Sequence, residues 1–224
     1  MRRLWRENSL ALAFLVLFLA ALAGQAYAGW HEFNSDATTH GEHSISLGRY
    51  LVSSAFGNAV MENWQSEYLQ FTLYILLTVW FVQRGSPESK ELGKEGTESD
   101  REQLVGEHAT ARSPRWARVR GVRLWIYSNS LLLVMATIWL GAWFAQSVTG
   151  WSDYNADQLV HGEHASSYRQ FLGTARFWES TLQNWQSEFL AVGSMAVLSI
   201  YLRQRGSPES KPVGSSHTAT GTEG

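Results

Sequence analysis

The string N-W-Q-S-E stands at residues 63–67 and again at residues 184–188. Aligned without a gap at this offset, residues 8–90 and 129–211 share roughly 33 identical residues in about 83 positions, which is typical of an internal duplication. Two other strings recur at the same offset: H-G-E-H from His40 and from His161, and Q-R-G-S-P-E-S-K from Gln83 and from Gln204. The sequence therefore predicts one structural unit used twice, with residues 1–90 as the first repeat and residues 124–211 as the second.

Each repeat contains two apolar blocks that predict membrane-spanning helices. The first blocks, about residues 8–28 and 124–149, are long enough to cross a hydrocarbon core of ~30 Å. The second blocks are shorter, so their helices must extend back through N-W-Q-S-E, which gives spans of about residues 60–83 and 181–204. The expected fold is an all-α membrane protein in which two parallel repeats of a transmembrane helical hairpin form a four-helix bundle.

The first apolar block has a second interpretation as a cleaved signal peptide. Arg2 and Arg3 precede it, and the residues A-Y-A at positions 26–28 resemble a signal-peptidase site. The aligned block of the second repeat lies in the middle of the chain, where a signal peptide does not occur. This favours a membrane anchor, and cleavage of the first span stays open as the alternative.

The distribution of Lys and Arg predicts the orientation of the chain. Of the 18 such residues, only Arg49, Arg169 and Arg176 lie in the loops within the repeats. Positive charge collects on the cytoplasmic side of membrane proteins. We therefore expect a multi-pass protein of the bacterial cytoplasmic (inner) membrane, with both termini and the linker in the cytoplasm.

The segments outside the repeats have little apolar character. Residues 91–123 are expected to form a linker that is first disordered and then basic, and residues 212–224 a disordered tail. The basic part abuts a span, which favours contact with anionic lipid headgroups over nucleic acid, and a net charge of −2 gives no general attraction for nucleic acid. The predicted headgroup contacts are Arg115, Arg118, Arg120 and Arg123.

Polar residues of the repeated string form the main candidate cluster: Asn63, Gln65, Glu67, Asn184, Gln186 and Glu188. Two acids brought together by pseudo-symmetry can share a proton, as a proton-coupled site requires. The alternative is an interfacial acid that favours the positive end of a helix dipole. Small residues four apart, which allow close helix packing, are found at Ala20, Gly24, Gly141 and Ala145.

The H-G-E-H strings offer four histidines on the outer side: His40, His43, His161 and His164. Imidazoles three residues apart can bind zinc or copper, but loop histidines show the same spacing, so the evidence for metal is weak and no cofactor is predicted. After each string, apolar residues at i, i+3, i+4 spacing begin at Leu47 and at Tyr168. These predict short amphipathic outer helices.

These repeated strings, together with the opening R-E-N-S-L, resemble a family of duplicated bacterial membrane proteins that is known only as a domain of unknown function. The resemblance covers nearly the whole chain apart from the linker and the tail. It implies a four-helix inner-membrane protein and assigns no activity and no catalytic residue.

The sequence lacks a phosphate-binding loop, a nucleophile elbow, a zinc-protease string and any cysteine. We therefore expect a non-enzymatic envelope component that acts through membrane lipids, a membrane protein partner or a second copy of the chain. One alternative is a small proton- or ion-coupled transporter or channel that uses acids at the repeat interface. A second alternative is a metal-dependent membrane enzyme.

Overall fold

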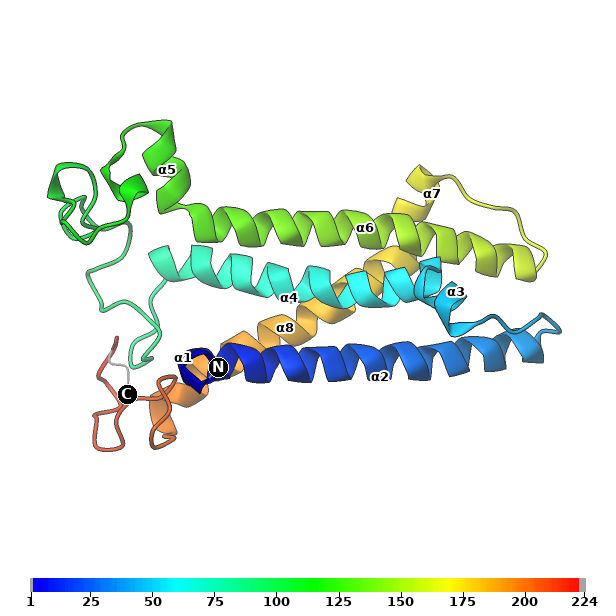
Figure 1. Ribbon diagram of the computed structural model, residues 1–224, viewed down its shortest axis with the longest axis horizontal. Coiled ribbons are helices and arrows are strands. Elements are labelled where there is room, and N and C mark those ends of the chain that lie inside the picture. Colours follow the sequence, from blue (N-terminus) through cyan, green and yellow to red (C-terminus); the bar gives the residue numbers. More distant parts are fainter. Residues whose placement is uncertain (1, 222–224) are drawn as a thin grey trace. The chain divides into compact units, whose positions relative to one another are not determined.

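The computed structural model describes residues 2–221, which are all helix, turn and loop. Four long helices dominate this part of the chain (Figure 1). The helices are α1 (Arg2–Glu7), α2 (Ser9–Thr39), α3 (Leu47–Leu51), α4 (Ser54–Trp80), η1 (Gly106–His108), η2 (Arg115–Arg118), α5 (Val122–Ser128), α6 (Ser130–Val160), α7 (Tyr168–Leu172) and α8 (Ala175–Tyr201).

The helices α2 and α6 begin after asparagines at corresponding positions of the two sequence copies. Asn8 (φ −129°) separates α1 from α2, and Asn129 (φ −109°) separates α5 from α6. Each asparagine carbonyl accepts the first hydrogen bond of the long helix at 2.9 Å, from Leu12 N–H and from Leu133 N–H. The segment expected as one span over residues 124–149 is therefore two helices that are separated at Asn129.

The same two helices continue beyond the apolar blocks and end at the H-G of H-G-E-H. Gly41 and Gly162 adopt positive φ angles of 78° and 72°. Gly41 N–H donates to the Thr38 carbonyl at 3.1 Å, and Glu42 N–H donates to the Ala37 carbonyl at 2.8 Å. The second copy forms the equivalent pair of bonds. This Schellman arrangement needs a left-handed residue, which glycine supplies without a Cβ penalty, so H-G is a helix stop.

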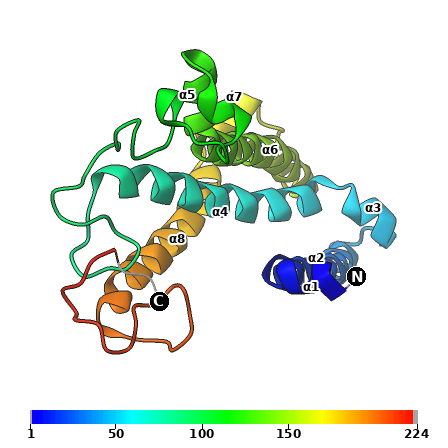
Figure 2. The same ribbon diagram turned by 60° about the vertical axis from the view of Figure 1, so that its left-hand side comes forward.

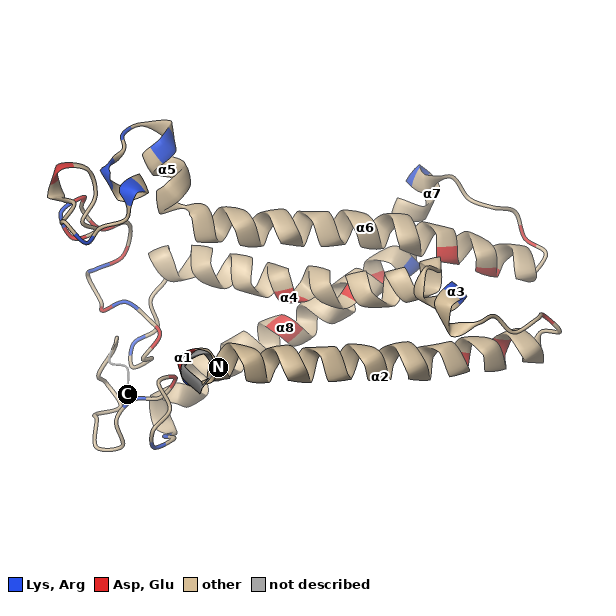
Figure 3. Cartoon of the chain, viewed as in Figure 1, with Lys and Arg blue, Asp and Glu red and all other residues tan. Residues whose placement is uncertain are grey.

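Two helices, α2 and α6, are long and apolar enough to cross a membrane, with mean hydropathies of 2.1 and 1.7 over their apolar windows. Their 31 residues give a length of about 46 Å, and the 27 residues of α4 and of α8 give about 40 Å. Figure 3 shows that the long helices carry few charges, whereas Lys and Arg are frequent in the linker. The linker and the tail form turns and short 3-10 helices; disorder in these segments stays a prediction.

The chain forms two compact units, and each unit contains parts of both sequence copies. The first unit comprises the residues up to Val60 together with Ala145–Phe171. The second comprises Met61–Phe144 and the residues from Leu172 onward. The boundaries between the two units fall inside α4, α6 and α7.

In the first unit, each outer loop is tied to the helix that precedes it. Trp30 Nε1 donates to the Ile45 carbonyl at 2.7 Å, and the corresponding Trp151 Nε1 donates to the Ser166 carbonyl at 2.8 Å. Gly29 permits a close contact, because a Cβ there would lie 2.4 Å from the Tyr50 hydroxyl oxygen. Packing around these loops therefore uses side chains that the two copies place at equivalent positions.

In the second unit, α8 crosses the part of α4 that follows Met61 (Figures 1 and 2). Leu69 on α4 and Ile200 on α8 belong to its buried apolar core. The crossing brings the two N-W-Q-S-E strings close together, which positions the candidate site.

Candidate functional site at the contact between α4 and α8

Polar side chains join α4 to α8 in the second unit. Asn184 Nδ2 donates to Glu62 Oε1 at 2.9 Å. Trp185 Nε1 donates to Gln65 Oε1 at 2.7 Å, and the Gln65 side chain is completely buried. A buried amide is costly unless its polar atoms are paired, so the indole N–H is an important partner for Gln65.

The repeated string lies inside each helix because both helices start earlier than the sequence predicted. Ser53 Oγ accepts from Phe56 N–H at 3.2 Å, and Thr174 Oγ1 accepts from Phe177 N–H at 3.3 Å. These hydroxyls stand at corresponding positions and act as N-caps. The helices therefore begin near residues 54 and 175 instead of 60 and 181.

As a result, the two candidate acids lie at the midpoints of their helices. Glu67 occupies the middle of α4, and Glu188 occupies the middle of α8. Glu188 is half-buried and interacts electrostatically with Glu67, which is exposed. The neighbouring Ser66 hydroxyl donates to the Asn63 carbonyl of its own helix at 2.9 Å. These residues of α4 and α8 form a polar seam, which comprises Glu62, Gln65, Ser66, Asn184, Trp185 and Glu188.

The two N-W-Q-S-E strings contribute residues from different positions to this seam. Gln65 is buried, whereas Gln186 at the corresponding position is exposed. Asn184 bonds to α4, whereas Asn63 is exposed. The contact is therefore asymmetric, although the five residues of the string are identical in the two copies.

This asymmetry predicts unequal effects of matched substitutions. Asn184→Leu should lower the thermal unfolding midpoint in detergent and cost about 1 kcal/mol, because the Glu62 carboxyl group then loses its amide donor. Asn63→Leu, at the corresponding exposed position, should lower the midpoint less. Equal shifts for the two variants would contradict the asymmetric seam.

An aromatic cluster beside the seam was not predicted from the sequence. Trp143 on α6 stacks on Trp139, with ring centroids 6.1 Å apart and planes within 8°. It also packs against three aromatic rings of α8: Phe177 at 6.5 Å, Trp178 at 6.3 Å and Trp185 at 5.6 Å. The i, i+4 spacing of the two α6 tryptophans could have predicted that they share one face of the helix. It could not have predicted which other helix packs against that face.

One helical turn beyond the seam, α4 and α8 line a cavity of about 180 Å³. The lining residues of the two helices are corresponding pairs of the sequence copies, namely Gln70 with Ala191, Phe71 with Val192, and Tyr74 with Met195. Glu88 completes the lining, and the Tyr74 hydroxyl donates a hydrogen bond to Glu88 Oε2. This cavity was not predicted, since it requires both copies.

The Q-R-G-S-P-E-S-K strings follow α4 and α8 with matching hydrogen bonds. Ser89 Oγ accepts from Gln83 N–H at 2.7 Å, and Ser210 Oγ accepts from Gln204 N–H at 2.9 Å. The same local sequence thus gives the same local turn twice. The lysine that ends each string then binds the segment that follows it.

Lys211, the lysine of the second string, is almost completely buried. Its Nζ lies 2.6–3.2 Å from four carbonyl oxygens, which share its three N–H donors: those of Gly85, Ser216, His217 and Ala219. Burial and, to a smaller extent, the charge of Arg203 lower the pKa of Lys211. The four acceptors act in the opposite direction, because they stabilise the ammonium form.

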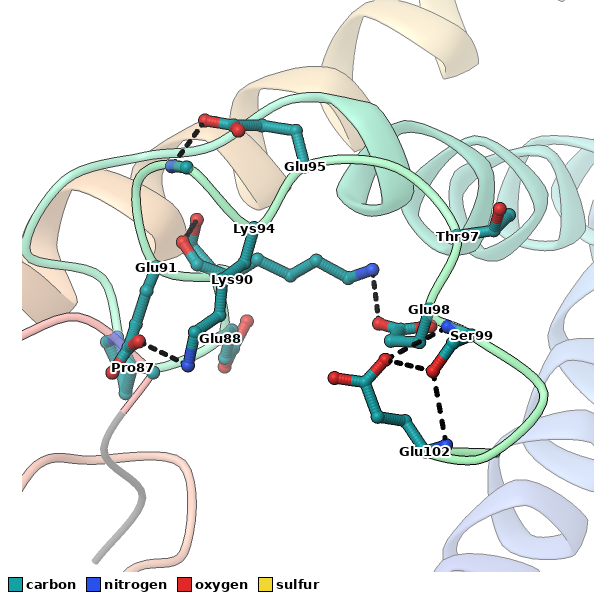
Figure 4. Close-up of a pocket in the computed structure, with 13 residues that line it drawn as sticks. Pro87, Glu88, Lys90, Glu91, Lys94, Glu95, Thr97, Glu98, Ser99 and Glu102 are labelled. Atoms are coloured by element: carbon teal, nitrogen blue, oxygen red, sulfur yellow. Dashed lines mark hydrogen bonds and ion pairs between the residues drawn. The ribbon is translucent and has the colours of Figure 1, made fainter. Parts of the chain in front are cut away.

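Lys90, the lysine of the first string, lies in a linker pocket of about 640 Å³ (Figure 4). Lys90 pairs with Glu98 at 2.5 Å, and Lys94 pairs with Glu91 at 2.6 Å. The hydrogen bond from Lys90 lowers the pKa of Glu98. Both lysines are thus neutralised within the linker.

The outer histidines form no metal cluster in the part of the chain that the structure describes. The rings of His40 and His161 lie 6.0 Å apart, and each Nδ1 lies 3.0 or 2.9 Å from the carbonyl oxygen of the aspartate four residues earlier. His43 and His164 are exposed. Within residues 2–221, no three His, Cys, Asp or Glu side chains are grouped as metal ligands. The structure instead gives the H-G of this string a role in ending α2 and α6.

We therefore expect purified protein to retain no stoichiometric zinc or copper, because two imidazoles alone make an incomplete site. Elemental analysis of protein prepared without chelators measures this directly. His43→Ala should leave the metal content unchanged. A bound ion that His43→Ala releases would restore the metal hypothesis.

Of the small residues that predicted close helix packing, Ala20, Gly24 and Gly141 are exposed, and Ala145 is half-buried. Gly24 and Gly141 have open space around them, since an added Cβ would meet no atom within 4 Å. Close helix contact there stays a prediction. The exposed arginines of the basic linker segment are Arg115, Arg118, Arg120 and Arg123, of which Arg118 donates to the Thr110 and Ala111 carbonyls.

Comparison with known proteins gives a family and no activity. The family model described as "Domain of unknown function (DUF6766)" matches residues 1–222, so the chain belongs to this family. No curated protein and no solved structure shows a significant match.

Proposed function

We propose that this family member is a non-enzymatic component of a bacterial inner membrane that acts through contacts with lipids or protein partners. In this proposal, two parallel copies of a transmembrane hairpin form a four-helix bundle. The observation that carries it is the use of the repeated polar string. Its side chains bond α4 to α8, as in Asn184 to Glu62 and Trp185 to Gln65, and so stabilise a helix contact.

The duplication is supported by matching local structure at positions that correspond between the copies. The helix starts at Asn8 and Asn129, the helix stops at Gly41 and Gly162, and the serine-capped turns after α4 and α8 all recur. Matching turns of this kind are expected when one folding unit is used twice.

The membrane location is supported by the exposure of apolar helices. The most apolar window of α2 contains no buried residue, and that of α6 is only 17% buried. Exposing apolar surface of this extent to water costs free energy, whereas contact with the apolar chains of lipids does not. We assign α4 and α8 as the other two spans, and the exposed arginines of the linker as contacts for anionic headgroups.

Reporter fusions test this topology. Fusions after Gly29 and Gly150 should report the periplasm, and fusions after Lys90 and Lys211 should report the cytoplasm, because positive charge is retained inside. A mature chain that begins near Gly29 would contradict the four-span arrangement, since cleavage would remove the first helix.

A proton- or ion-coupled transporter is the second candidate, favoured by the proximity of Glu67 and Glu188 at the helix midpoints. Flux into proteoliposomes distinguishes the two candidates. In the non-enzymatic proposal, a pH gradient drives no flux through wild-type protein. A proton flux that Glu188→Gln abolishes and that Gln186→Leu retains would establish the transporter instead.

A further inference from the structure

We infer that the cavity between α4 and α8 binds a small organic cation, that is, a positively charged nitrogen attached to an apolar body. The cavity has a carboxyl group, two aromatic side chains and three apolar side chains in its lining. Its volume of about 180 Å³ is below the range of about 300–1,000 Å³ that is usual for drug-sized ligands, so the ligand must be small.

The carboxyl group of Glu88, which is half-buried and lines both this cavity and the linker pocket, favours a positive partner. In the described part of the chain, Glu88 interacts only with Tyr74, whose hydroxyl bonds to Oε2. The neighbouring lysines are paired elsewhere, Lys90 with Glu98 and Lys94 with Glu91 (Figure 4). A carboxylate next to an apolar cavity is costly without a counter-ion. A bound cation would supply the missing charge.

A second carboxylate, that of Glu209, acts on the tyrosine of the cavity. Glu209 acts electrostatically on Tyr74, as Glu88 does. Glu88 and Glu209 occupy the same position in the two Q-R-G-S-P-E-S-K strings. This arrangement repels anions and attracts cations.

The remaining lining determines which kind of cation fits. Phe71 and Tyr74 are aromatic, and aromatic rings attract quaternary ammonium groups, while Val192 and Met195 supply apolar contact. A metal ion such as calcium needs six to eight oxygen ligands, and this lining has too few. An organic cation matches both the charge and the apolar surface.

Divergence between the copies gives the cavity its two unlike sides. The first copy contributes Gln70, Phe71 and Tyr74, which are polar or aromatic. At the corresponding positions the second copy contributes Ala191, Val192 and Met195, each of which is smaller than its counterpart. Large residues from both copies would fill the space. The open volume therefore depends on the small residues of α8.

The test is a binding measurement on purified full-length protein in a non-ionic detergent. The ligand is benzyltrimethylammonium, and the control is neopentylbenzene, its neutral isostere, each corrected for partition into empty micelles. Calorimetric titration should detect saturable binding of the cation and none of the neutral compound. This measurement requires neither transport nor a membrane partner, so its outcome is independent of the proposed function.

Matched variants assign the binding to this cavity. Glu88→Gln keeps the shape but removes the charge and should weaken binding on the order of tenfold or more. Val192→Phe places the first copy's side chain on α8 and should abolish binding by filling the cavity. Glu209→Gln, at the equivalent turn outside the lining, should weaken binding much less than Glu88→Gln.

Several results would overturn the inference. The first is that the wild-type protein does not bind the cation, and the second is that it binds the neutral isostere as tightly as the cation. The third is that Glu88→Gln and Val192→Phe both bind the cation with wild-type affinity. Equal binding of the isostere would identify an apolar groove for a lipid chain. The thermal unfolding midpoint of each variant checks folding, and Glu88→Gln replaces Val192→Phe as the decisive variant if the latter does not fold.

Discussion

Replacing Trp185 with alanine is expected to lower the free energy of unfolding by about 3–5 kcal/mol. The indole packs on Trp143 with ring centroids 5.6 Å apart and donates to the buried Gln65 at 2.7 Å. Alanine would leave a cavity in the aromatic cluster and remove the donor for a buried acceptor, and these two costs add. Denaturant titration of the purified protein in mixed micelles measures the loss.

Trp64→Ala is the matched control, because it changes the same residue of the first string. The Trp64 ring contacts Tyr68 on its own helix, with centroids 6.5 Å apart. We therefore expect a clearly smaller loss of stability than for Trp185→Ala. If the two variants lose the same free energy, the difference between the copies of the string has no energetic consequence.

Replacing Lys211 with methionine should release the segment that follows it. Methionine keeps much of the apolar stem but cannot donate to the four carbonyl groups that the ammonium now binds. A hydrogen bond to a charged group contributes about 1.5–3 kcal/mol, so amide exchange in residues 212–221 should accelerate on the order of tenfold to a hundredfold. Hydrogen exchange read by mass spectrometry resolves this segment from the long helices.

Lys90→Met is the matched control for the faster amide exchange expected in Lys211→Met. Lys90 binds the Gly96 carbonyl and Glu98 within the linker, so its loss should loosen the linker and leave the tail protected. Unchanged exchange of the tail in Lys211→Met would show that the carbonyl contacts do not hold it. Rapid exchange of the tail already in the wild type would instead support the disorder that its composition predicts.

The proposed cavity and the polar seam lie one helical turn apart along the same two helices. Substitutions in the seam therefore test stability, whereas Glu88→Gln tests binding. This separation matters because a variant that loses both properties is unfolded and says nothing of the ligand. Asn184→Leu and Glu88→Gln together show whether the contact of α4 with α8 serves stability, recognition or both.

The sequence by itself determined the local features of this protein. The apolar blocks predicted helices but placed the ends of the first spans at residues 28 and 149. The helices α2 and α6 continue to Thr39 and Val160, where Gly41 and Gly162 end them, because a left-handed residue at a helix end depends only on nearby backbone. The identical strings after α4 and α8 likewise give identical turns, since their hydrogen bonds join residues six apart. The family of unknown function to which the chain belongs is likewise identified from its sequence, over residues 1–222.

Only the tertiary structure decided which of two corresponding residues is buried and bonded to another helix. Gln65 is buried and bonded to Trp185, whereas Gln186 is exposed, although both belong to the same five-residue string. The cavity likewise needs Tyr74 from one copy and Val192 from the other. The physical reason is that burial, and the pairing of side chains between helices, depend on the angle and register at which two helices cross. Those quantities are set by packing over the whole unit, so identical local sequences can have different environments.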